Sequence, residues 1–311
     1  MSLAFVFPGQ GSQSVGMMNG WADSAQAALV KATFDEASGV LGQDLWAMVN
    51  DGPADDLNAT INTQPIMLTA GVAAWRAYLV SGGAMPAVMA GHSLGEYTAL
   101  VAAEAISFGD ALQLVRLRAE AMQEAVPAGT GAMAAILNLA DDEIIAACAE
   151  AAQGEVVQAV NFNSPGQVVI AGNKAAVERA CEACKARGAK RALLLPVSVP
   201  SHCDLMKPAA EKLAAKLASI AINAPKVPVL HNADVAAYSD VAAVRDALVR
   251  QLYQPVRWVE TVQKMVADGV TLVAECGPGK VLVGLNKRIA ADLNSVALLD
   301  AAALDALKVA E

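Results

Sequence analysis

The sequence predicts an α/β fold with a large parallel-sheet core of the hydrolase type and an inserted, smaller ferredoxin-like subdomain. Short apolar runs that end at Pro or Gly alternate with amphipathic helical segments over most of the 311 residues, as in a parallel sheet covered by helices. Between residues 126 and 197 the order changes to strand, helix, strand, strand, helix, strand, the split βαβ arrangement. We therefore expect a discontinuous large domain of residues 1–125 and 198–311 and an inserted domain of residues 126–197.

The predicted elements follow from apolar runs, helical periodicity and the residues that interrupt them. Pro8 ends the apolar run from Leu3 to Phe7, and Ser107 with Asp110 forms a capping box at the start of a helix. In the large domain we expect strands near 3–7, 86–90, 227–230 and 270–274, and helices near 24–37, 65–80, 96–103, 107–124, 240–253 and 257–268. In the inserted domain we expect strands near 132–137, 156–160, 167–171 and 191–197, and helices from 141 and over 173–187.

Composition and charge exclude several classes of protein. With 55% hydrophobic and 17% charged residues the chain is too apolar to be disordered, and its net charge of −9 disfavours nucleic-acid binding. Charged residues, Pro or Gly interrupt each apolar stretch before the roughly 18 residues that a membrane-spanning helix needs. The first ten residues lack the basic start of a signal peptide. We expect a cytoplasmic protein without membrane contact.

The five cysteines are too few and too scattered for a disulfide framework. We expect free thiols. Cys181 and Cys184 have C-x-x-C spacing, but they fall within a predicted helix and no second pair or His cluster accompanies them. We interpret them as packing residues and expect no metal site.

A serine flanked by glycines lies between a predicted strand and a predicted helix. The segment Gly91-His-Ser-Leu-Gly95 has the G-x-S-x-G pattern, in which the glycines permit a sharp turn that exposes the serine. The following helix N-terminus offers N–H groups and a positive dipole that favour an oxyanion. Ser93 is therefore a candidate nucleophile, although small residues at this spacing also recur by chance in a chain rich in Gly and Ala.

A serine nucleophile needs a base, and the chain has only three histidines. His92 is adjacent to the serine, where neighbouring side chains diverge, so we interpret it as a structural support. His231 ends an apolar run and is also interpreted as structural. His202 follows Pro200 and Ser201 where the chain leaves the inserted domain, so a loop can carry it into a cleft. We favour His202 as the base.

No acid has the expected place for a hydrolase triad, in which the carboxylate lies between serine and histidine in chain order. Only the inserted domain lies there, and its Asp141 and Asp142 are helix N-terminal residues by pattern. A Ser–His dyad is a weaker acid and base than a triad. Thiolate leaving groups need less protonation than amines, so the pattern indicates thioester substrates rather than peptides.

Arg118 lies on an apolar stripe of its predicted helix. Spacings of three and four residues place it with Val115 and Met122, whereas Arg116 falls on the polar flank. A buried guanidinium needs an anion. Unless the side chain extends to the surface, its partner is either an internal carboxylate or a carboxylate of the substrate held by two hydrogen bonds. In the second case Arg118 selects a dicarboxylic acyl group.

The loop Pro8-Gly-Gln-Gly-Ser-Gln13 follows the first predicted strand. Its backbone N–H groups are placed to complete an oxyanion hole with the N–H after the nucleophile. A dinucleotide site is excluded because a G-x-G-x-x-G pattern starting at Gly9 would place glycine where Ser14 stands. The segment Gly277-Pro-Gly-Lys280 likewise lacks the remaining residues of a phosphate-binding loop.

Six segments together carry a resemblance to a known family: Phe5-Val-Phe-Pro-Gly-Gln-Gly-Ser-Gln13, Gly91-His-Ser-Leu-Gly-Glu-Tyr97, Val115-Arg-Leu-Arg118, Asn161-Phe-Asn-Ser-Pro-Gly-Gln167, Val197-Ser-Val-Pro-Ser-His202 and Gln251-Leu-Tyr-Gln-Pro-Val256. The chain closely resembles the malonyl-CoA:acyl carrier protein transacylases of bacterial type II fatty acid synthesis. Related acyltransferase domains of polyketide synthases share several of these segments.

The resemblance implies a role for each matching residue and a ping-pong reaction without a cofactor, in which the partners are malonyl-CoA and holo acyl carrier protein. Ser93 would carry the acyl group, His202 would be its base, and Arg118 would bind the malonyl carboxylate. Gln10 and Leu94 would supply the oxyanion N–H groups, and Gln251 would orient the histidine by its side-chain amide or its main-chain carbonyl. His92 would be a supporting neighbour of the serine, and Asn161 would line the cleft for the pantetheine arm.

Docking of an acidic carrier protein on an acidic enzyme requires a local basic patch. We expect Lys190, Arg191, Lys287 and Arg288 to flank the mouth of the cleft and share this role. We also expect a monomer.

Three other functions compete with this prediction. A serine esterase or thioesterase shares the G-x-S-x-G pattern, but it needs no inward arginine. A carrier-binding module without catalysis needs none of the three residues Ser93, His202 and Arg118. A polyketide-type acyltransferase with malonyl or branched malonyl substrates is poorly separated by sequence.

Overall fold

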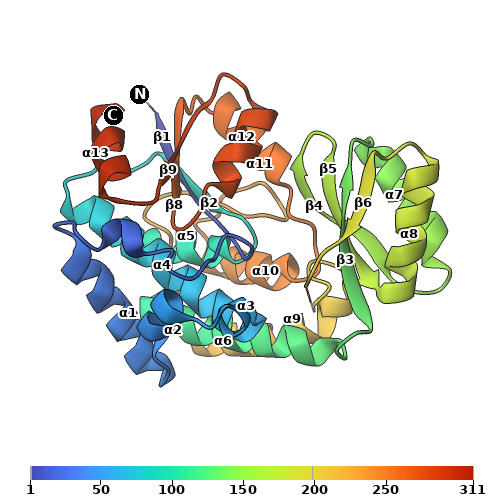
Figure 1. Cartoon of the computed structure of the whole chain (residues 1–311), viewed down its shortest axis with the longest axis horizontal. Coiled ribbons are helices and arrows are strands. Elements are labelled where there is room, and N and C mark those ends of the chain that lie inside the picture. Colours follow the sequence, from blue (N-terminus) through green and yellow to red (C-terminus); the bar gives the residue numbers. More distant parts are fainter. Residues whose placement is uncertain (1, 198, 311) are drawn as a thin grey trace.

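The computed structural model describes residues 2–197 and 199–310 and contains two sheets (Figure 1). Within these residues one sheet has five strands in the order β7-β2-β1-β8-β9, and the other has four strands in the order β4-β5-β3-β6. The first sheet is parallel and the second antiparallel, which confirms the predicted fold class. The predicted domain limits at residues 1, 198 and 311 lie outside the described residues.

The parallel sheet consists of β1 (Leu3–Phe7), β2 (Val88–Gly91), β7 (Val229–Leu230), β8 (Leu272–Cys276) and β9 (Asn294–Leu298). The helices of this domain are α1 (Ala27–Leu41), α2 (Leu45–Asp51), α3 (Ala54–Asn58), α4 (Thr60–Val80), α5 (Gly95–Ala102), α6 (Phe108–Ala125), α9 (Lys207–Ser219), α10 (Val241–Gln251), α11 (Trp258–Ala267), α12 (Val281–Ile289) and α13 (Ala301–Ala310), with short 3₁₀ turns at Asn19–Trp21 and Asp204–Met206. None of the helices in the described residues is both long enough and apolar enough to cross a membrane.

Burial on both faces explains why the central strands are continuous apolar runs. All five residues of β1 are buried, and β1 pairs in parallel with β2 on one side and β8 on the other. A parallel sheet with helices on both faces has no solvent-facing positions in its centre. The carboxyl ends of β1, β2 and β7 therefore meet at one edge, where loops after the strands gather functional residues.

The small domain consists of β3 (Gly131–Leu137), α7 (Asp141–Ala152), β4 (Val157–Ser164), β5 (Gln167–Asn173), α8 (Lys174–Ala186) and β6 (Arg191–Leu194). Its two helices pack together against the sheet and enclose a separate apolar core. Cys148, Cys181 and Cys184 are free thiols buried in this core, so the prediction that the C-x-x-C pair is packing is confirmed.

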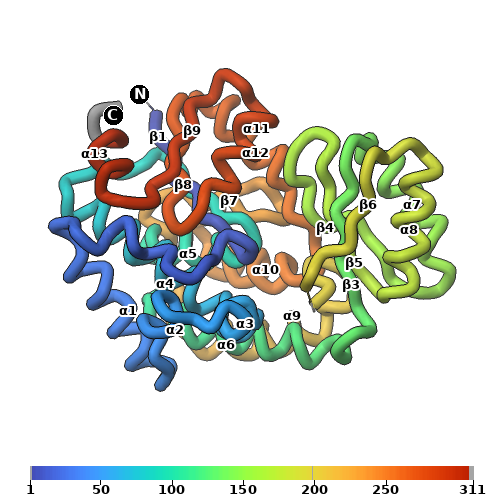
Figure 2. The backbone as a smooth tube through the Cα atoms, in the orientation of Figure 1, coloured from blue at the N-terminus to red at the C-terminus, as the bar shows by residue number. Residues whose placement is uncertain are grey.

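Main-chain hydrogen bonds join the two domains at β4. The Phe162 N–H donates to the Val256 carbonyl at 3.0 Å, and the Val256 N–H donates to the Val160 carbonyl at 2.8 Å. The backbone trace in Figure 2 passes into the small domain after α6 and returns to the large domain before α9, so the small domain is an insertion. The junction places β4 beside the loop that leads to α11.

Candidate active site

The serine lies in a tight turn between β2 and α5. Ser93 has a φ of 52°, in the left-handed region, which a residue with a Cβ atom rarely adopts. A Cβ atom on Gly91 would collide with the backbone of Gly95, and one on Gly95 would collide with the Phe7 carbonyl. The two glycines of the G-x-S-x-G pattern are therefore required by backbone approach.

His202 is hydrogen-bonded to the serine and to a main-chain carbonyl. Its Nε2 lies 2.7 Å from Ser93 Oγ, and its Nδ1 lies 2.7 Å from the carbonyl oxygen of Gln251. A carbonyl only accepts hydrogen bonds, so Nδ1 carries the proton and the neutral Nε2 accepts from the serine hydroxyl. The ring is thus held in the tautomer that a general base needs.

Burial keeps the histidine uncharged. His202 is 3% exposed. Desolvation, followed by the nearby Arg118 charge, lowers the pKa of His202 from 6.5 to about 3, although the hydrogen bond to Gln251 opposes the shift. At neutral pH the imidazole is therefore free to accept a proton.

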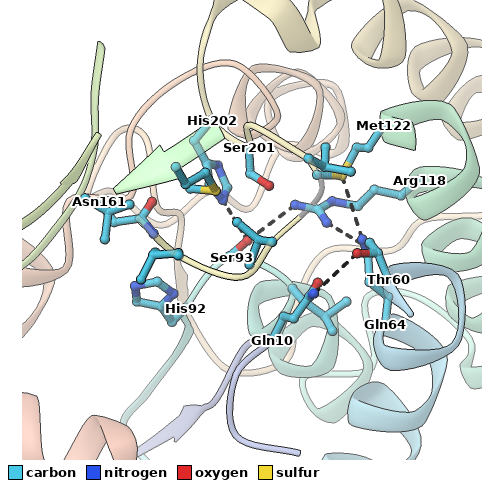
Figure 3. A pocket seen from close by; sticks show the side chains of 16 residues that line it. Gln10, Thr60, Gln64, His92, Ser93, Arg118, Met122, Asn161, Ser201 and His202 are labelled. Carbon is cyan, nitrogen blue, oxygen red and sulfur yellow. Dashed lines mark hydrogen bonds between the residues drawn. The ribbon is translucent and has the colours of Figure 1, made fainter. Parts of the chain in front are cut away.

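Arg118 is 2% exposed and reaches the same point from α6. Its Nη1 donates to Gln64 Oε1 at 2.9 Å, and its Nη2 donates to Ser93 Oγ at 3.4 Å (Figure 3). The Nη2 also donates to Gln251 Oε1 at 3.2 Å. Within the described residues no carboxylate forms an ion pair with it. Of the two partners that the sequence left open, no internal acid is present among these residues.

Two backbone N–H groups near the serine are free to bind an oxyanion. In the part of the chain that the structure describes, neither the Gln10 N–H nor the Leu94 N–H donates to another protein group. A Cβ atom on Gly9 would lie 2.5 Å from the His92 carbonyl oxygen. The loop after β1 therefore packs directly on the serine turn, and this contact needs glycine.

These groups meet in a pocket of about 140 Å³ between the domains (Figure 3). Asn161, Met133 and Val169 line it from the small domain, and the large domain contributes the remaining predicted pocket residues, Gln10, His92, Ser93, Leu94, Arg118 and His202. Gln251 lies behind this surface, where its side-chain Nε2 also donates to the Ser93 carbonyl at 2.9 Å. All eight of these predicted catalytic and substrate-binding positions are thus brought together.

His92 and Asn161 have different surroundings. His92 Nε2 lies 2.8 Å from Asn163 Oδ1, and burial lowers the pKa of His92. The His92 ring packs against Trp258. Asn161 Oδ1 is buried at the pocket wall without a protein partner among the described residues. His92 therefore faces the small domain rather than the serine hydroxyl, whereas Asn161 offers a free acceptor.

The four predicted docking cations do not line the pocket. Lys190 and Arg191 lie at the start of β6, and Lys287 and Arg288 lie in the last turn of α12. In the small sheet, Leu137 of β3 lies between Arg191 of β6 on one side and Gln167 of β5 on the other. Because Arg288 donates to Gln167 Oε1 at 2.6 Å, the two pairs of cations share one end of the small sheet.

Sequence reasoning missed two buried polar residues of the site. Gln64 on α4 binds Arg118, and Asn232 accepts a hydrogen bond from the Ser93 N–H at 2.7 Å. Gln64 directly precedes the predicted helix 65–80 and follows the polar residues Asn62 and Thr63, so no local signal marked it. For Asn232 the signal was its position just after the predicted strand 227–230, because residues that follow parallel strands gather at one edge of the sheet. No group of three or more potential metal ligands occurs in the described residues.

Comparison with known proteins gives consistent matches. The acyl transferase domain family matches residues 4–299. A curated relative from Salmonella typhimurium, malonyl CoA-acyl carrier protein transacylase, is 62% identical over 97% of both chains. An acyl-carrier-protein S-malonyltransferase from Burkholderia pseudomallei is 61% identical, with a TM-score of 0.96 over 99% of this chain and 100% of that one. A malonyl-transacylase solved in complex with its type II polyketide acyl carrier protein is 55% identical over the whole of both chains, with a TM-score of 0.98.

The matches extend over the parallel sheet, the inserted domain and the pocket between them. Matches of this length and identity cover the whole architecture and not only the serine turn. The chain therefore belongs to the malonyl CoA-acyl carrier protein transacylase family and is an acyltransferase.

Proposed function

We propose that the chain transfers the malonyl group from malonyl-CoA to the pantetheine thiol of holo acyl carrier protein, and so supplies fatty acid elongation. The observation that carries the proposal is a buried Arg118 without an acidic partner among the described residues, 3.4 Å from the hydroxyl of a serine that is bonded to a neutral histidine. A buried guanidinium is stabilised by a carboxylate. A malonyl group attached to Ser93 would bring its free carboxylate close to this guanidinium.

The first half-reaction follows from the positions of the donors. His202 Nε2 takes the proton of the Ser93 hydroxyl as Oγ bonds to the thioester carbon. The N–H groups of Gln10 and Leu94 bind the oxygen that becomes negative. The carbon–sulfur bond then breaks, CoA leaves, and its sulfur receives the proton from the imidazolium. The malonyl group remains as an ester on Ser93.

The second half-reaction is the same chemistry in reverse with a different thiol. The pantetheine thiol of the carrier protein gives its proton to His202 and attacks the ester carbon, and Ser93 Oγ leaves with that proton. One thioester is consumed and one is formed, so the exchange is nearly balanced in energy and we propose that it uses no cofactor. Gln251 holds the histidine through its carbonyl, which adds no negative charge to stabilise an imidazolium.

The carrier protein would dock at the end of the small sheet that holds Lys190, Arg191, Lys287 and Arg288. Within the described residues none of these four cations pairs with an acidic side chain, whereas Lys185 and Arg187 in the same domain pair with glutamates. Unpaired cations remain available to an acidic partner. Leu195 lines the pocket four residues after Arg191, a span of about 13 Å in an extended strand. We also propose that the enzyme works as a monomer in the cytoplasm, because one chain supplies every group of this site.

The first experiment incubates the protein separately with malonyl-CoA and acetyl-CoA and records intact and peptide masses. We expect one malonyl group on the peptide that contains Ser93 and little acetyl adduct, and no adduct on Ser93→Ala. Equal labelling by both donors would remove Arg118 from the selectivity argument. Absence of any adduct together with rapid hydrolysis of the donor would favour a thioesterase.

A polyketide carrier protein is a second candidate acceptor, because a relative that is 55% identical was solved with one. Side-by-side transfer to fatty acid and polyketide carrier proteins distinguishes them. A kcat/KM that is similar for both would indicate that one enzyme serves both routes.

A further inference from the structure

A buried asparagine clamps the backbone of the serine turn. The side-chain Nδ2 of Asn232 donates to the Gly91 carbonyl at 2.6 Å, and its Oδ1 accepts from the Ser93 N–H at 2.7 Å. Asn232 is 1% exposed. It directly follows His231 at the end of β7, which pairs with β2. One amide thus bridges the two residues on either side of His92.

The bridge acts where the backbone is strained. A φ of 52° at Ser93 is unfavourable for a residue with a Cβ atom and persists only if its surroundings hold it. Asn232 holds the N–H of Ser93, and Gln251 Nε2 holds its carbonyl at 2.9 Å. The next N–H along the chain, that of Leu94, donates to no protein group among the described residues. The Ser93 N–H is thus bound by Asn232, whereas the Leu94 N–H stays available for an oxyanion. We call this pair of hydrogen bonds between Asn232 and the serine turn the clamp.

A buried acid in turn fixes the asparagine. Glu96 is fully buried in the first turn of α5, where the helix dipole favours a negative charge. Its Oε2 accepts from the Asn232 N–H at 2.9 Å, and its Oε1 lies 2.7 Å from His231 Nδ1. The carboxylate therefore ties the helix that follows the serine to the segment that follows β7.

We propose that Asn232 is a positioning residue for acyl transfer: its amide sets the backbone of Ser93 so that Oγ meets His202 and the Leu94 N–H stays free for the oxyanion. Asn232 acts through the Ser93 backbone, and Glu96 with His231 sets the orientation of Asn232. The inference rests on the proposed function only for the identity of the acyl group. The positioning of Ser93 itself is independent of the donor.

The test compares two variants with a matched control. Asn232→Ala removes the whole bridge. Asn232→Asp keeps the size and the acceptor for the Ser93 N–H but places a second acceptor against the Gly91 carbonyl. Asn173→Ala is the control, because Asn173 Oδ1 also accepts a backbone N–H, that of Val156 at 2.8 Å, in the small domain.

Two rates are measured for each variant, together with Tm. The first is sulfonylation of Ser93 by phenylmethylsulfonyl fluoride, followed by mass, which needs neither malonyl-CoA nor carrier protein. The second is malonyl transfer, with kcat and KM separated. We expect Asn232→Ala to lose about 10- to 100-fold in the sulfonylation rate and in kcat, with KM for malonyl-CoA little changed. Asn173→Ala should keep both rates.

The pH profile of Asn232→Asp provides a readout that loss of stability alone would not move. The introduced carboxyl group lies beside Glu96, with His231, His92, His202 and Arg118 as the other charged or titratable groups around this turn. Its protonated form restores a donor to the Gly91 carbonyl. We therefore expect the sulfonylation rate of Asn232→Asp, relative to that of the unchanged protein, to rise as the pH falls.

The outcomes separate the two proposals. Native rates in Asn232→Ala, or equal rate losses in Asn232→Ala and Asn173→Ala, would overturn the clamp. If Asn232→Ala does not fold, the isosteric Asn232→Asp decides, and a flat relative pH profile would overturn the clamp. Normal sulfonylation of the unchanged protein without malonyl transfer would overturn the proposed function and leave the clamp testable.

Discussion

At the residue scale, the charge of Arg118 connects the proposed selectivity for the acyl group with the basicity of His202. Arg118 donates to Ser93 Oγ, and its positive charge contributes to the lowered pKa of His202. A malonyl carboxylate on Arg118 would compensate that charge. Binding of the correct acyl group would therefore make His202 a stronger base in the step that uses it.

Arg118→Gln separates these two effects. We expect acylation by malonyl-CoA to fall by at least about 100-fold, because a charge-assisted hydrogen bond to the carboxylate is lost, while acylation by acetyl-CoA changes much less. Removal of the positive charge should also raise the pKa of His202. The acidic limb of the pH profile for acetyl-CoA should then move to higher pH, measured by single-turnover mass spectrometry. An unmoved limb would show that Arg118 does not influence the histidine.

Most groups of the site were predictable at this scale, and the exceptions have a physical reason. Ser93, His202 and Arg118 lie at chain positions with recognisable patterns, and the structure brings their side chains together. Asn232 and Gln64 act on these residues through backbone or amide contacts that are distant in sequence. Local periodicity does not encode such contacts. The histidine is oriented by the main chain of Gln251, so the amide side chain, left open as an alternative, serves Arg118 and Ser93 instead.

At the scale of elements, the approach of β1, β2 and α5 depends on glycine. We expect Gly95→Ala to destabilise the protein by more than about 2 kcal/mol, because its Cβ atom would collide with the Phe7 carbonyl. Gly39→Ala, within α1 and with nothing near its Cβ position, is the control and should be neutral or stabilising. Chemical denaturation of both variants checks the prediction. Equal stability of the two would mean that the strands can move apart.

Elements with strong periodicity were predicted well, and elements that depend on packing were not. The strand over 3–7 was placed correctly, and the helix predicted over 107–124 is α6, with the predicted cap of Ser107 on the Asp110 N–H. The short helices α2 and α3 lie between the predicted helices 24–37 and 65–80, where no element was predicted. Their lengths of seven and five residues are too short for an independent helical signal. The elements α9, α12, β9 and α13 were also left unassigned, and the strand expected over 191–197 is shorter, ending at Leu194.

At the scale of the whole molecule, the buried imidazoles of His202 and His92 link stability to pH. Burial lowers the pKa of His202 to about 3 and also lowers that of His92. In the unfolded chain both rings bind protons below their ordinary pKa of 6.5, while the folded protein keeps His202 neutral down to about 3. The unfolded state therefore binds more protons in this window, and stability falls as the pH is lowered through it.

Urea titrations between pH 7.5 and 4.5 check this linkage. We expect His202→Gln to flatten the decline in the free energy of unfolding as the pH falls. A parallel decline in both proteins would assign the effect to other groups. The double variant with His92→Gln reports the contribution of the second ring.

The basic end of the small sheet makes a prediction for the complete enzyme and its partner. Reversal of charge at Lys190, Arg191, Lys287 and Arg288 should raise KM for the carrier protein at low salt and leave KM for malonyl-CoA nearly unchanged. Reversal at Lys185 and Arg187, which already pair with glutamates, is the control. Steady-state kinetics at two salt concentrations measure both, since added salt screens docking charges. An unchanged KM at low salt contradicts the docking surface.

The backbone bonds of Val256 to Val160 and Phe162 have a consequence for how the acyl-enzyme avoids water. They join the small sheet to the large domain from main chain to main chain, so we expect them to restrict rotation of one domain against the other. We expect the pocket over Ser93 to keep a similar width when the substrate enters. The ester on Ser93 is then shielded from water only by the molecule that occupies this pocket. We therefore expect the partners themselves to cover the ester, through the arm of CoA in one half-reaction and the arm of the carrier protein in the other.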